Sequence, residues 1–256
     1  MYSGVVYSST EKDSACAWTT STNNKAVGNY QKRAYSYRIV SFLQLSGKPG
    51  NPKYNGHEYV EIGGLKWATM NVGATSETDA GLYFQWGDTQ GYTADQVGNG
   101  EGQKYFDWTD YKWTEDGGST MTKYNETDGK TVLEAADDAA VANWGGSWRM
   151  PTIAELQALG DAVNTEWTND YQGSGIAGLV CTDKTDSSKI LFFPAVGNCY
   201  DGNVRGVGNF GIYYLSSLFV DGDLYSDSFY FESGYADWED SSNWRYFGYP
   251  VRPVAD

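Results

Sequence analysis

The sequence predicts an α+β fold in which short strands and long structured loops surround two helices. The 256-residue chain holds 21 Tyr, 10 Trp, 10 Phe and 31 Gly, whereas residues that favour helices are scarce. Aromatic residues favour strands, and Gly, Asp and Ser favour turns. Two stretches nevertheless have the composition and the end signals of helices, so we expect a mixed fold rather than an all-β one.

Charge and hydropathy exclude several classes of function. The formal net charge is −15, and nucleic acids and anionic membranes are bound through basic patches. No apolar run reaches the roughly 20 residues that span a membrane. The first residues lack the basic and apolar regions of a signal peptide. We therefore expect no nucleic-acid partner and no membrane insertion.

Three segments are expected along the chain. Residues 1–45 are predicted to form a short β-rich segment. Residues 46–57 are predicted to be a linker, because Pro49 and Pro52 lie there among glycines. Residues 58–256 are then the main domain, and its size suits one large domain.

Two Tyr/Ser-rich segments of the chain resemble each other. Residues 6–9 precede residues 37–40 by an interval similar to that between residues 214–217 and residues 250–254. The pattern suggests that residues 1–45 are a tail-like partial repeat of the domain. Coincidence between two β segments of similar composition explains it equally well.

The expected strands of the main domain are short. Residues 59–62 and 66–71 flank the tight turn Gly63-Gly64. Further strands are expected at 82–86, 178–182 and 189–194. Residues 89–129 form a long polar loop, which its own aromatic side chains are expected to hold in place; these are Tyr105, Phe106, Trp108, Tyr111 and Trp113.

Two helices are expected in the middle of the chain. Residues 133–143 are rich in helix formers and end at Gly145-Gly146, a typical helix stop. Residues 152–163 begin with Thr152, and Glu155 follows at the capping-box spacing. The helix at 152–163 is expected to help hold the scaffold.

The sequence contains no strong pattern of catalytic residues. His57 is the only histidine, so neither Cys181 nor Cys199 has an evident base, and a Cys/His zinc site is improbable. Asp137 and Asp138 are adjacent on a helix and point to different faces, one toward solvent and the other toward a cap or Arg149. We therefore expect no enzyme.

The three cysteines allow at most one disulfide. Cys181 and Cys199 lie on neighbouring predicted strands, whereas Cys16 lies in the first segment. This spacing permits a bridge and does not require one.

Metal binding is the next candidate. Asp221, Asp223 and Asp227, or Asp237, Glu239 and Asp240, offer the clustered oxygens that Ca²⁺ prefers. The EF-hand order is missing, and a solvated acidic loop is favoured. No cofactor is therefore expected, although calcium is compatible with these residues.

The last stretch, residues 208–254, has the composition of a contact surface, because Tyr and Trp supply contact area while Ser, Gly and Asn adapt. Phe229 and Phe231 alternate as in a strand with one buried face. The remaining rings cannot all turn inward, and exposed aromatic clusters are usually binding sites. The alternative is that these rings pack on the aromatic loop at 105–113.

Several motifs, in order, resemble one known family. They are GLKWATMNVGA at 64–74, YFQWGD at 83–88, DDAA at 137–140, WGGSWRMPT at 144–152 and VRPV at 251–254. They resemble the major paralogous domain first named from Fibrobacter succinogenes, which is abundant in gut Bacteroidetes. That family is similar to C-type lectin folds and to the formylglycine-generating-enzyme superfamily. The resemblance implies a C-type-lectin-like domain over residues 58–256.

The resemblance also bears on function. Some members look like the variable proteins of diversity-generating retroelements, in which adenine-directed mutagenesis rewrites the last segment. Such mutagenesis of Asn codons cannot produce Lys, Gln, Met, Glu or Trp. Lys, Gln and Met are absent from residues 212–250, whereas Glu232, Glu239, Trp238 and Trp244 would have to be fixed in the template. The sugar-binding motifs of true lectins and the catalytic cysteines of the enzymes are also absent, so neither activity is implied.

The leading hypothesis is a non-enzymatic binding protein with an extracellular, cell-surface or phage-virion location. Its partner would be a protein or glycan on a cell surface. Trp67, Trp86, Trp144 and Trp148 would hold the scaffold, and replacing several contact residues with Ala would leave the melting temperature nearly unchanged. The predicted ligand-binding residues are Tyr214, Leu215, Leu218, Phe219, Asp221, Asp223, Tyr225, Asp227, Tyr230, Tyr235, Asp237, Trp238, Asp240, Trp244 and Tyr246.

Two alternatives come from other classes of protein. One is a structural adhesion module, such as a fibre or pilus tip component, whose last strands make subunit contacts. The other is an enzyme of the formylglycine-generating type, which requires a reactive cysteine at Cys181 or Cys199.

Overall fold

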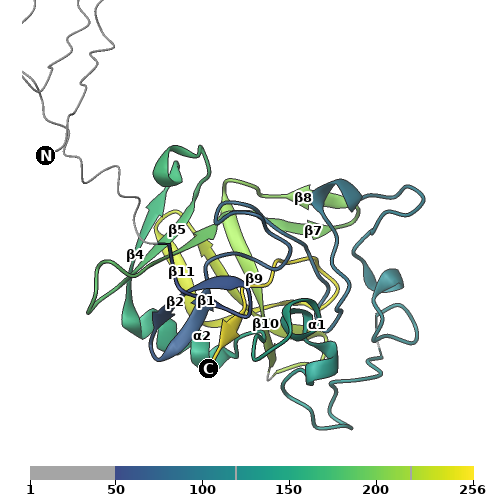
Figure 1. Cartoon of the computed structure of the whole chain (residues 1–256). Helices are drawn as coiled ribbons and strands as arrows, with labels where there is room; N and C mark the ends of the chain where they lie inside the picture. The colour runs from purple at the N-terminus through teal and green to yellow at the C-terminus, as the bar shows by residue number, and fades with distance from the viewer. Residues whose placement is uncertain (1–49, 119, 220) are drawn as a thin grey trace, which may run out of the picture. The chain divides into compact units, whose positions relative to one another are not determined.

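The structure, a computed structural model, describes residues 50–256 except residues 119 and 220 (Figure 1). Residues 51–256 form one unit of mixed α+β structure, with two α-helices and four small antiparallel sheets among the described residues. The predicted β-rich segment, its partial repeat and Cys16 lie outside the described residues.

The first sheet joins the start of the unit to its end. Its strand order is β1-β2-β3-β12, and Val254 of β12 pairs with Trp67 of β3. The expected turn at Gly63-Gly64 is confirmed, since both residues have the positive φ that glycine tolerates. The strands are β1 (Lys53–Tyr54), β2 (His57–Ile62), β3 (Leu65–Ala68) and β12 (Val254–Ala255).

The predicted linker extends too far into the unit. Lys53 pairs with Glu58, and Tyr54 pairs with His57, so these residues form a hairpin of the first sheet. Asn55 and Gly56 form the turn of this hairpin, and both have positive φ.

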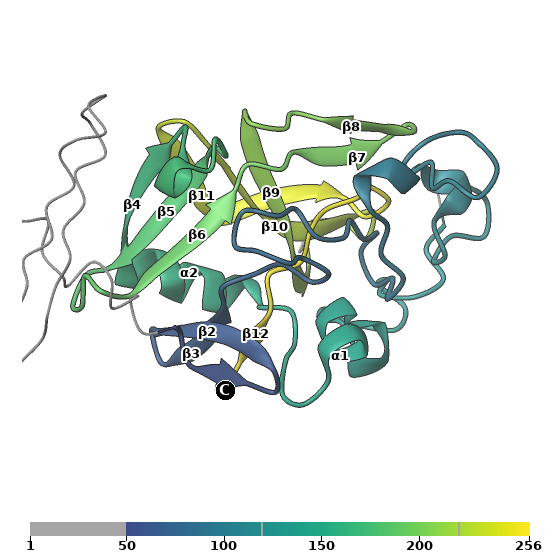
Figure 2. The same cartoon turned by 45° about the horizontal axis from the view of Figure 1, so that its top comes forward.

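Three further sheets build the rest of the unit (Figure 2). Their orders are β11-β10-β9, β4-β5-β6 and β7-β8. The strands are β4 (Val163–Thr168), β5 (Gly178–Asp183), β6 (Ile190–Pro194), β7 (Asn198–Tyr200), β8 (Asn203–Arg205), β9 (Phe210–Leu218), β10 (Tyr225–Glu232) and β11 (Tyr235–Trp244).

The strand predictions are confirmed only in part. β5 and β6 lie where they were expected, whereas β4 and the β7–β8 hairpin were not expected. β4 has little apolar alternation, because three successive residues, 164–166, are all exposed. Residues 82–86 form only isolated bridges, Tyr83 with Tyr92 and Phe84 with Tyr249.

The first helix, α1 (Ala139–Trp144), is shorter than predicted and follows a 3₁₀ turn at Ala135–Asp137. Asp138 separates the two elements, because its side chain accepts hydrogen bonds from the N–H groups of Ala140 and Val141 and so begins a new helix. The stop at Gly145 is confirmed.

The expectation that one of Asp137 and Asp138 faces solvent is wrong, since both are buried. The expectation that the other acts as a cap is confirmed, because Asp138 caps α1. Asp138 also accepts from the N–H of Met150, at 2.8 Å, and Asp137 accepts from the Tyr124 hydroxyl at 2.6 Å. Asp137 further pairs with Lys123. Arg149 instead binds Glu155.

The second helix, α2 (Ile153–Ala162), confirms the capping box. The Thr152 hydroxyl accepts from the N–H of Glu155, while the Glu155 carboxylate accepts from the N–H of Thr152 at 2.8 Å. Arg149 donates two hydrogen bonds to the same carboxylate, at 2.8 and 2.6 Å. This network fixes the start of α2 against the preceding loop.

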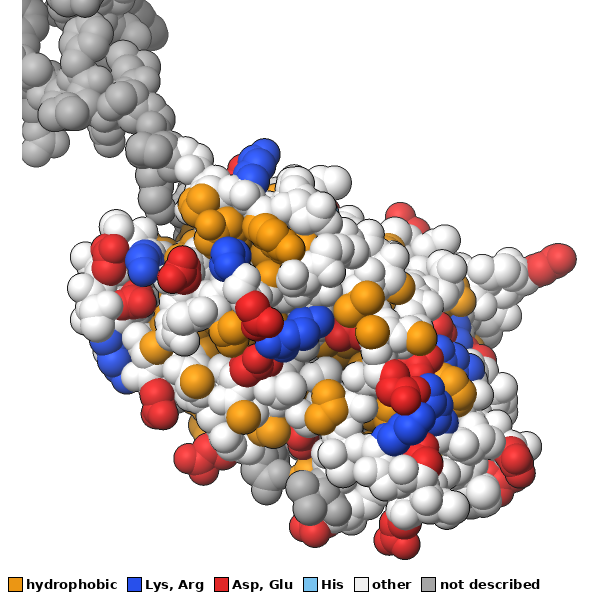
Figure 3. All heavy atoms as spheres, turned by 60° about the horizontal axis from the view of Figure 1, so that its bottom comes forward, with side chains coloured by type: hydrophobic (Ala, Val, Ile, Leu, Met, Phe, Trp, Pro, Cys, Tyr) orange, Lys and Arg blue, Asp and Glu red, His pale blue; other side chains and the backbone are white. Residues whose placement is uncertain are grey.

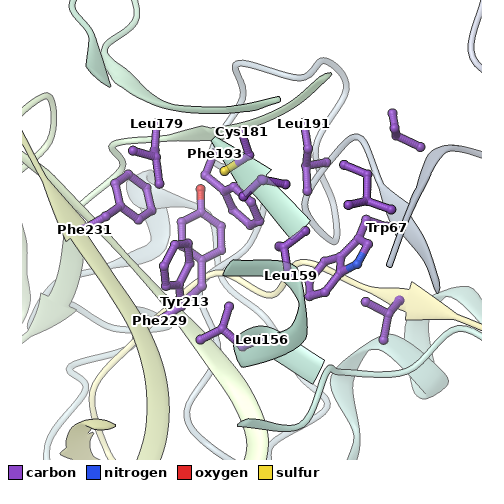
Figure 4. Close-up of a cluster of buried hydrophobic side chains, with 14 of the residues drawn as sticks. Trp67, Leu156, Leu159, Leu179, Cys181, Leu191, Phe193, Tyr213, Phe229 and Phe231 are labelled. Carbon is purple, nitrogen blue, oxygen red and sulfur yellow. The ribbon is translucent and has the colours of Figure 1, made fainter. Parts of the chain in front are cut away.

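The largest core cluster lies where α2 meets the sheets (Figure 4). Leu156 and Leu159 of α2 face Phe229 and Phe231 of β10, which are buried as expected. Phe193 of β6 meets both Phe rings, with centroids 5.3 and 6.2 Å away. The predicted scaffold residues Trp67, Trp86 and Trp148 are also buried, and Trp144 packs partly exposed beside Trp148.

The surface carries an excess of negative charge. On the face in Figure 3, basic side chains lie beside acidic ones, with small hydrophobic areas between them. The chain has 33 acidic and 18 basic residues, which gives the formal net charge of −15. Within the described residues, none of the helices is long and apolar enough to cross a membrane.

Candidate functional site

The structure divides the predicted ligand-binding residues into four groups, of which the first is buried. Tyr214, Leu215 and Asp227 are at most 5 % exposed, so their prediction as ligand contacts is wrong. Tyr214 points inward from β9, and its hydroxyl donates to the carbonyl of Phe247 at 2.7 Å. The composition of the stretch indicated a surface, but β9 is buried along most of its length and therefore also needs large inward-facing rings.

The second group packs against α2. The Trp238 ring lies 4.4 Å from Phe229 between centroids, and it covers Gly160 of α2. The glycine leaves the space that this ring occupies. Trp238 is therefore only partly exposed and joins β11 to the helix, which gives it a structural role.

The third group lies near the hairpin between β10 and β11. Tyr230 of β10 lies opposite Asp237 of β11 in the antiparallel pair. The Tyr230 hydroxyl donates to the Glu232 carboxylate at 2.8 Å. Tyr235 is 53 % exposed, and its ring lies 6.3 Å from Tyr230. This group is accessible but small.

The fourth group forms a larger surface. Phe219 lies 6.4 Å from Tyr225, which lies 4.4 Å from Trp244, all between ring centroids. Trp108, from the loop before the helices, lies 5.8 Å from Trp244 and 4.6 Å from Tyr246. The alternative reading of the sequence, that these rings pack on the loop at 105–113, is thus confirmed for Trp244 and Tyr246.

The ring contacts continue beyond Tyr246. Phe247 lies 4.7 Å from Tyr246 and stacks on Tyr200 of the β7–β8 hairpin, at 4.8 Å and 21°. Each of these side chains is partly exposed. We call this set the aromatic strip; it consists of Phe219, Tyr225, Trp244, Trp108, Tyr246, Phe247 and Tyr200.

Four chain segments meet at the aromatic strip, because Phe219 and Tyr225 come from the end of β9 and the start of β10. Figure 2 shows the β7–β8 hairpin, the end of β11 and the segment before residue 110 gathered at one side of the unit. Packed rings in offset or edge-to-face arrangements stabilise one another by about 0.5–1.5 kcal/mol per pair. Packing among the rings therefore holds the strip together while part of each ring stays accessible.

Acidic residues shape the loop that carries Trp108. The Asp110 carboxylate accepts from the N–H groups of Tyr105 and Phe106, at 3.1 and 3.0 Å. Asp107 caps the 3₁₀ turn at Trp108–Asp110. Because these turns are locked by local hydrogen bonds, the position of Trp108 is fixed.

A buried arginine supports the strip from below. Arg245 is fully buried, and its guanidinium lies 4.6 Å above the Trp86 ring. It donates to the Tyr111 hydroxyl at 2.8 Å and to the carbonyls of Tyr124 and Asp223, at 3.0 and 2.6 Å. Arg245 thereby ties the residue before Tyr246 to the loop and to the start of β10.

The surroundings of the strip are negatively charged. The pKa of Tyr246 is raised by burial, and next by the charges of Asp201 and Asp107. Asp221 is exposed, whereas Asp223 is partly buried. Asp240 lies on β11, and its side chain is not among those described. At the far end of the strip, the Arg205 guanidinium lies 4.0 Å above Tyr200.

The candidate catalytic residues are not brought together. His57 stacks on Trp144, at 3.6 Å and 6° between rings, and burial lowers its pKa. Cys181 and Cys199 are buried free thiols, so the bridge that the spacing permitted is not formed. Burial raises the pKa of both thiols, which disfavours the reactive thiolate.

Within the part of the chain that the structure describes, His, Cys, Asp and Glu form no group of three that could hold a metal ion.

Leu218, another predicted ligand-binding residue, is partly buried beside the second core cluster. Three members of the strip were missed as site residues, namely Trp108, Phe247 and Tyr200. Their large rings beside Gly and Asp were the available signal, but their proximity depends on pairing between distant segments.

No protein-family model, curated protein or solved structure matches the chain. The family suggested by the sequence motifs therefore remains a prediction.

Proposed function

We propose that residues 51–256 form a non-enzymatic ligand-binding domain, in which a C-type-lectin-like scaffold presents the aromatic strip to a macromolecular ligand at a cell surface. The observation that supports this proposal is the strip itself. Its seven partly exposed rings come from segments as far apart as Trp108 and Tyr246 and meet on one surface.

The physical argument is the cost of leaving such rings accessible. An aromatic side chain gains most free energy when it is fully removed from water, and soluble proteins rarely expose contiguous apolar patches without a function. Tyr, Trp and Phe are also enriched at the centres of interfaces. A binding surface accounts for both the exposure and the residue types.

Array binding with matched variants tests this proposal. The labelled domain is applied to arrays of neutral oligosaccharides and of synthetic peptides, and the double variant Trp244→Ala/Tyr246→Ala is compared with Tyr59→Ala. Tyr59 is a partly exposed ring on β2, outside the strip. We expect the double variant to lose binding by at least about tenfold, equivalent to about 1.4 kcal/mol, and the control to retain it.

A second measurement avoids dependence on variants that lose stability. Hydroxyl-radical footprinting of the unmodified domain, with and without an array-selected ligand, should show protection of Trp108, Trp244 and Tyr246. Protection confined to Tyr230 and Tyr235 would instead assign binding to the hairpin group and contradict the proposal.

Retroelement diversification of the last segment is part of the same proposal and has its own test. The encoding locus should contain a reverse transcriptase gene and a near-copy of the final segment rich in AAC codons. A locus without either would contradict diversification and leave the ligand-binding proposal standing.

A further inference from the structure

We infer that the ligand of the aromatic strip is a basic protein segment, whose Arg and Lys side chains lie over the strip rings beside Asp107 and Asp201. The inference rests on the proposed function, because it names the class of ligand for that surface.

The first observation is the pair of carboxylates around Tyr246. Asp107 directly precedes Trp108, and Asp201 directly follows Tyr200. Both are close enough for their charges to raise the pKa of Tyr246. A cation on the Tyr246 ring would therefore be attracted by the negative ring face and by the charges of these two carboxylates.

The second observation is a guanidinium that the chain itself places on the strip. Arg205 lies 4.0 Å above the Tyr200 ring, although its side chain is exposed. Beneath the strip, Arg245 lies 4.6 Å above Trp86. Both contacts show that rings in this region accept a planar cation at stacking distance, which Arg does better than Lys.

The length of the strip favours a segment over a single small cation. Alternate residues of an extended peptide lie about 7 Å apart on one side. The centroids of Trp244 and Tyr246 are 6.1 Å apart, and those of Trp108 and Trp244 are 5.8 Å apart. Successive side chains on one side of an extended segment can thus reach neighbouring rings.

The net charge of the whole chain also favours a basic ligand. A net charge of −15 attracts basic partners and repels anionic ones before contact. A neutral glycan would stack on the same rings without gaining from Asp107 or Asp201. Charge complementarity therefore selects the basic segment.

Binding of defined peptides tests the inference. The probes are an extended peptide with Arg at alternate positions and the same peptide with citrulline, which is neutral, at those positions. The domain variants are Asp107→Asn/Asp201→Asn and the control Asp161→Asn/Glu61→Asn, which removes two exposed carboxylates elsewhere. Asn at position 107 keeps an oxygen that can cap the 3₁₀ turn.

We expect the Arg peptide to bind the unmodified domain at least about tenfold more tightly than the citrulline peptide. Asp107→Asn/Asp201→Asn should weaken Arg-peptide binding by about tenfold and the control by less than about twofold. Binding should also weaken as salt rises from about 0.05 to about 0.5 M, because exposed charges are screened.

The outcomes separate this inference from the proposed function. If the citrulline peptide or a neutral oligosaccharide binds as well, and only Trp244→Ala/Tyr246→Ala abolishes binding, the strip is a binding site and the basic ligand is wrong. If no probe responds to the strip variants, both the inference and the proposed function fail.

Discussion

Arg245 and Arg252 are buried cations that hold the C-terminal segment through carbonyl oxygens and neutral side chains. Arg252 donates to the carbonyls of Ala68 and Phe192, at 3.1 and 3.0 Å, and to the Asn71 side chain. Burial lowers the pKa of Arg252. Each arginine therefore replaces its lost hydration with several hydrogen bonds, and each depends on partners far away in the sequence.

Removing one of these arginines leaves its partners unsatisfied. Arg245→Met should lower the free energy of unfolding by about 3 kcal/mol, because buried carbonyls lose their donors and water cannot replace them. Denaturant titration measures the change. Arg205→Met, at an exposed position, is the control and should change stability by less than about 0.5 kcal/mol. Equal effects of the two substitutions would contradict the anchoring role of Arg245.

At the scale of elements, local sequence patterns predicted the start of α2 but did not predict the residues of the aromatic strip. Thr152 and Glu155 lie three residues apart, so their capping box is readable from the sequence. Phe229 and Phe231 alternate within one strand and were also predicted to be buried. Trp108 meets Trp244 only because two distant segments fold together, and no local pattern encodes that pairing. The same limitation placed Tyr214 at the surface.

The capping box predicts a dependence of stability on pH. Burial raises the pKa of Glu155, but hydrogen bonds from Arg149 and Thr152 outweigh it, so the pKa lies below its ordinary value of 4.5. A group with a lowered folded-state pKa stabilises fully above its unfolded pKa, and this stabilisation disappears as pH falls through the folded value.

Glu155→Gln should therefore lower the free energy of unfolding near neutral pH by about 1 kcal/mol. The difference from the unmodified domain should shrink as the pH falls below 4.5, as followed by denaturant titration at several pH values. The exposed Glu61→Gln serves as control. A difference that stays constant down to acid pH would show that the Glu155 charge does not stabilise the helix start.

The contact between α2 and β11 makes a second prediction at this scale. A Cβ at Gly160 would lie 2.7 Å from the Trp238 ring. Gly160→Ala should therefore destabilise the unit, although Ala favours helices by about 1 kcal/mol. In a Trp238→Ala background the same substitution should stabilise by about 1 kcal/mol.

The double-mutant cycle is measured by denaturant unfolding, and additive effects would contradict the contact. Trp238→Ala alone should cost about 2 kcal/mol, because its ring packs on Phe229. The expectation from the sequence, that Ala at the predicted contact residues leaves the melting temperature unchanged, is thus restricted to exposed positions such as Tyr235.

For the whole unit, β9 connects the two largest core clusters. Tyr213 and Leu215 face the cluster with Phe229, whereas Ile212 and Tyr214 face the cluster with Trp86. Alternating side chains of one strand point to opposite faces, so the two clusters share a single backbone. Loss of either cluster removes the support of β9, and we expect residues 51–256 to unfold cooperatively.

The two buried thiols report on this cooperativity, because they lie in different clusters. Cys181 belongs to the cluster around Phe229, and Cys199 contacts Phe106 beneath the loop of Trp108. In a Cys16→Ser variant, both thiols should be protected from an alkylating reagent under native conditions and should become reactive at the same denaturant concentration. Peptide mass spectrometry after pulse labelling measures each thiol separately. Earlier labelling of Cys199 would show that the strip side opens on its own, and the strip would then be a mobile surface rather than a preformed one.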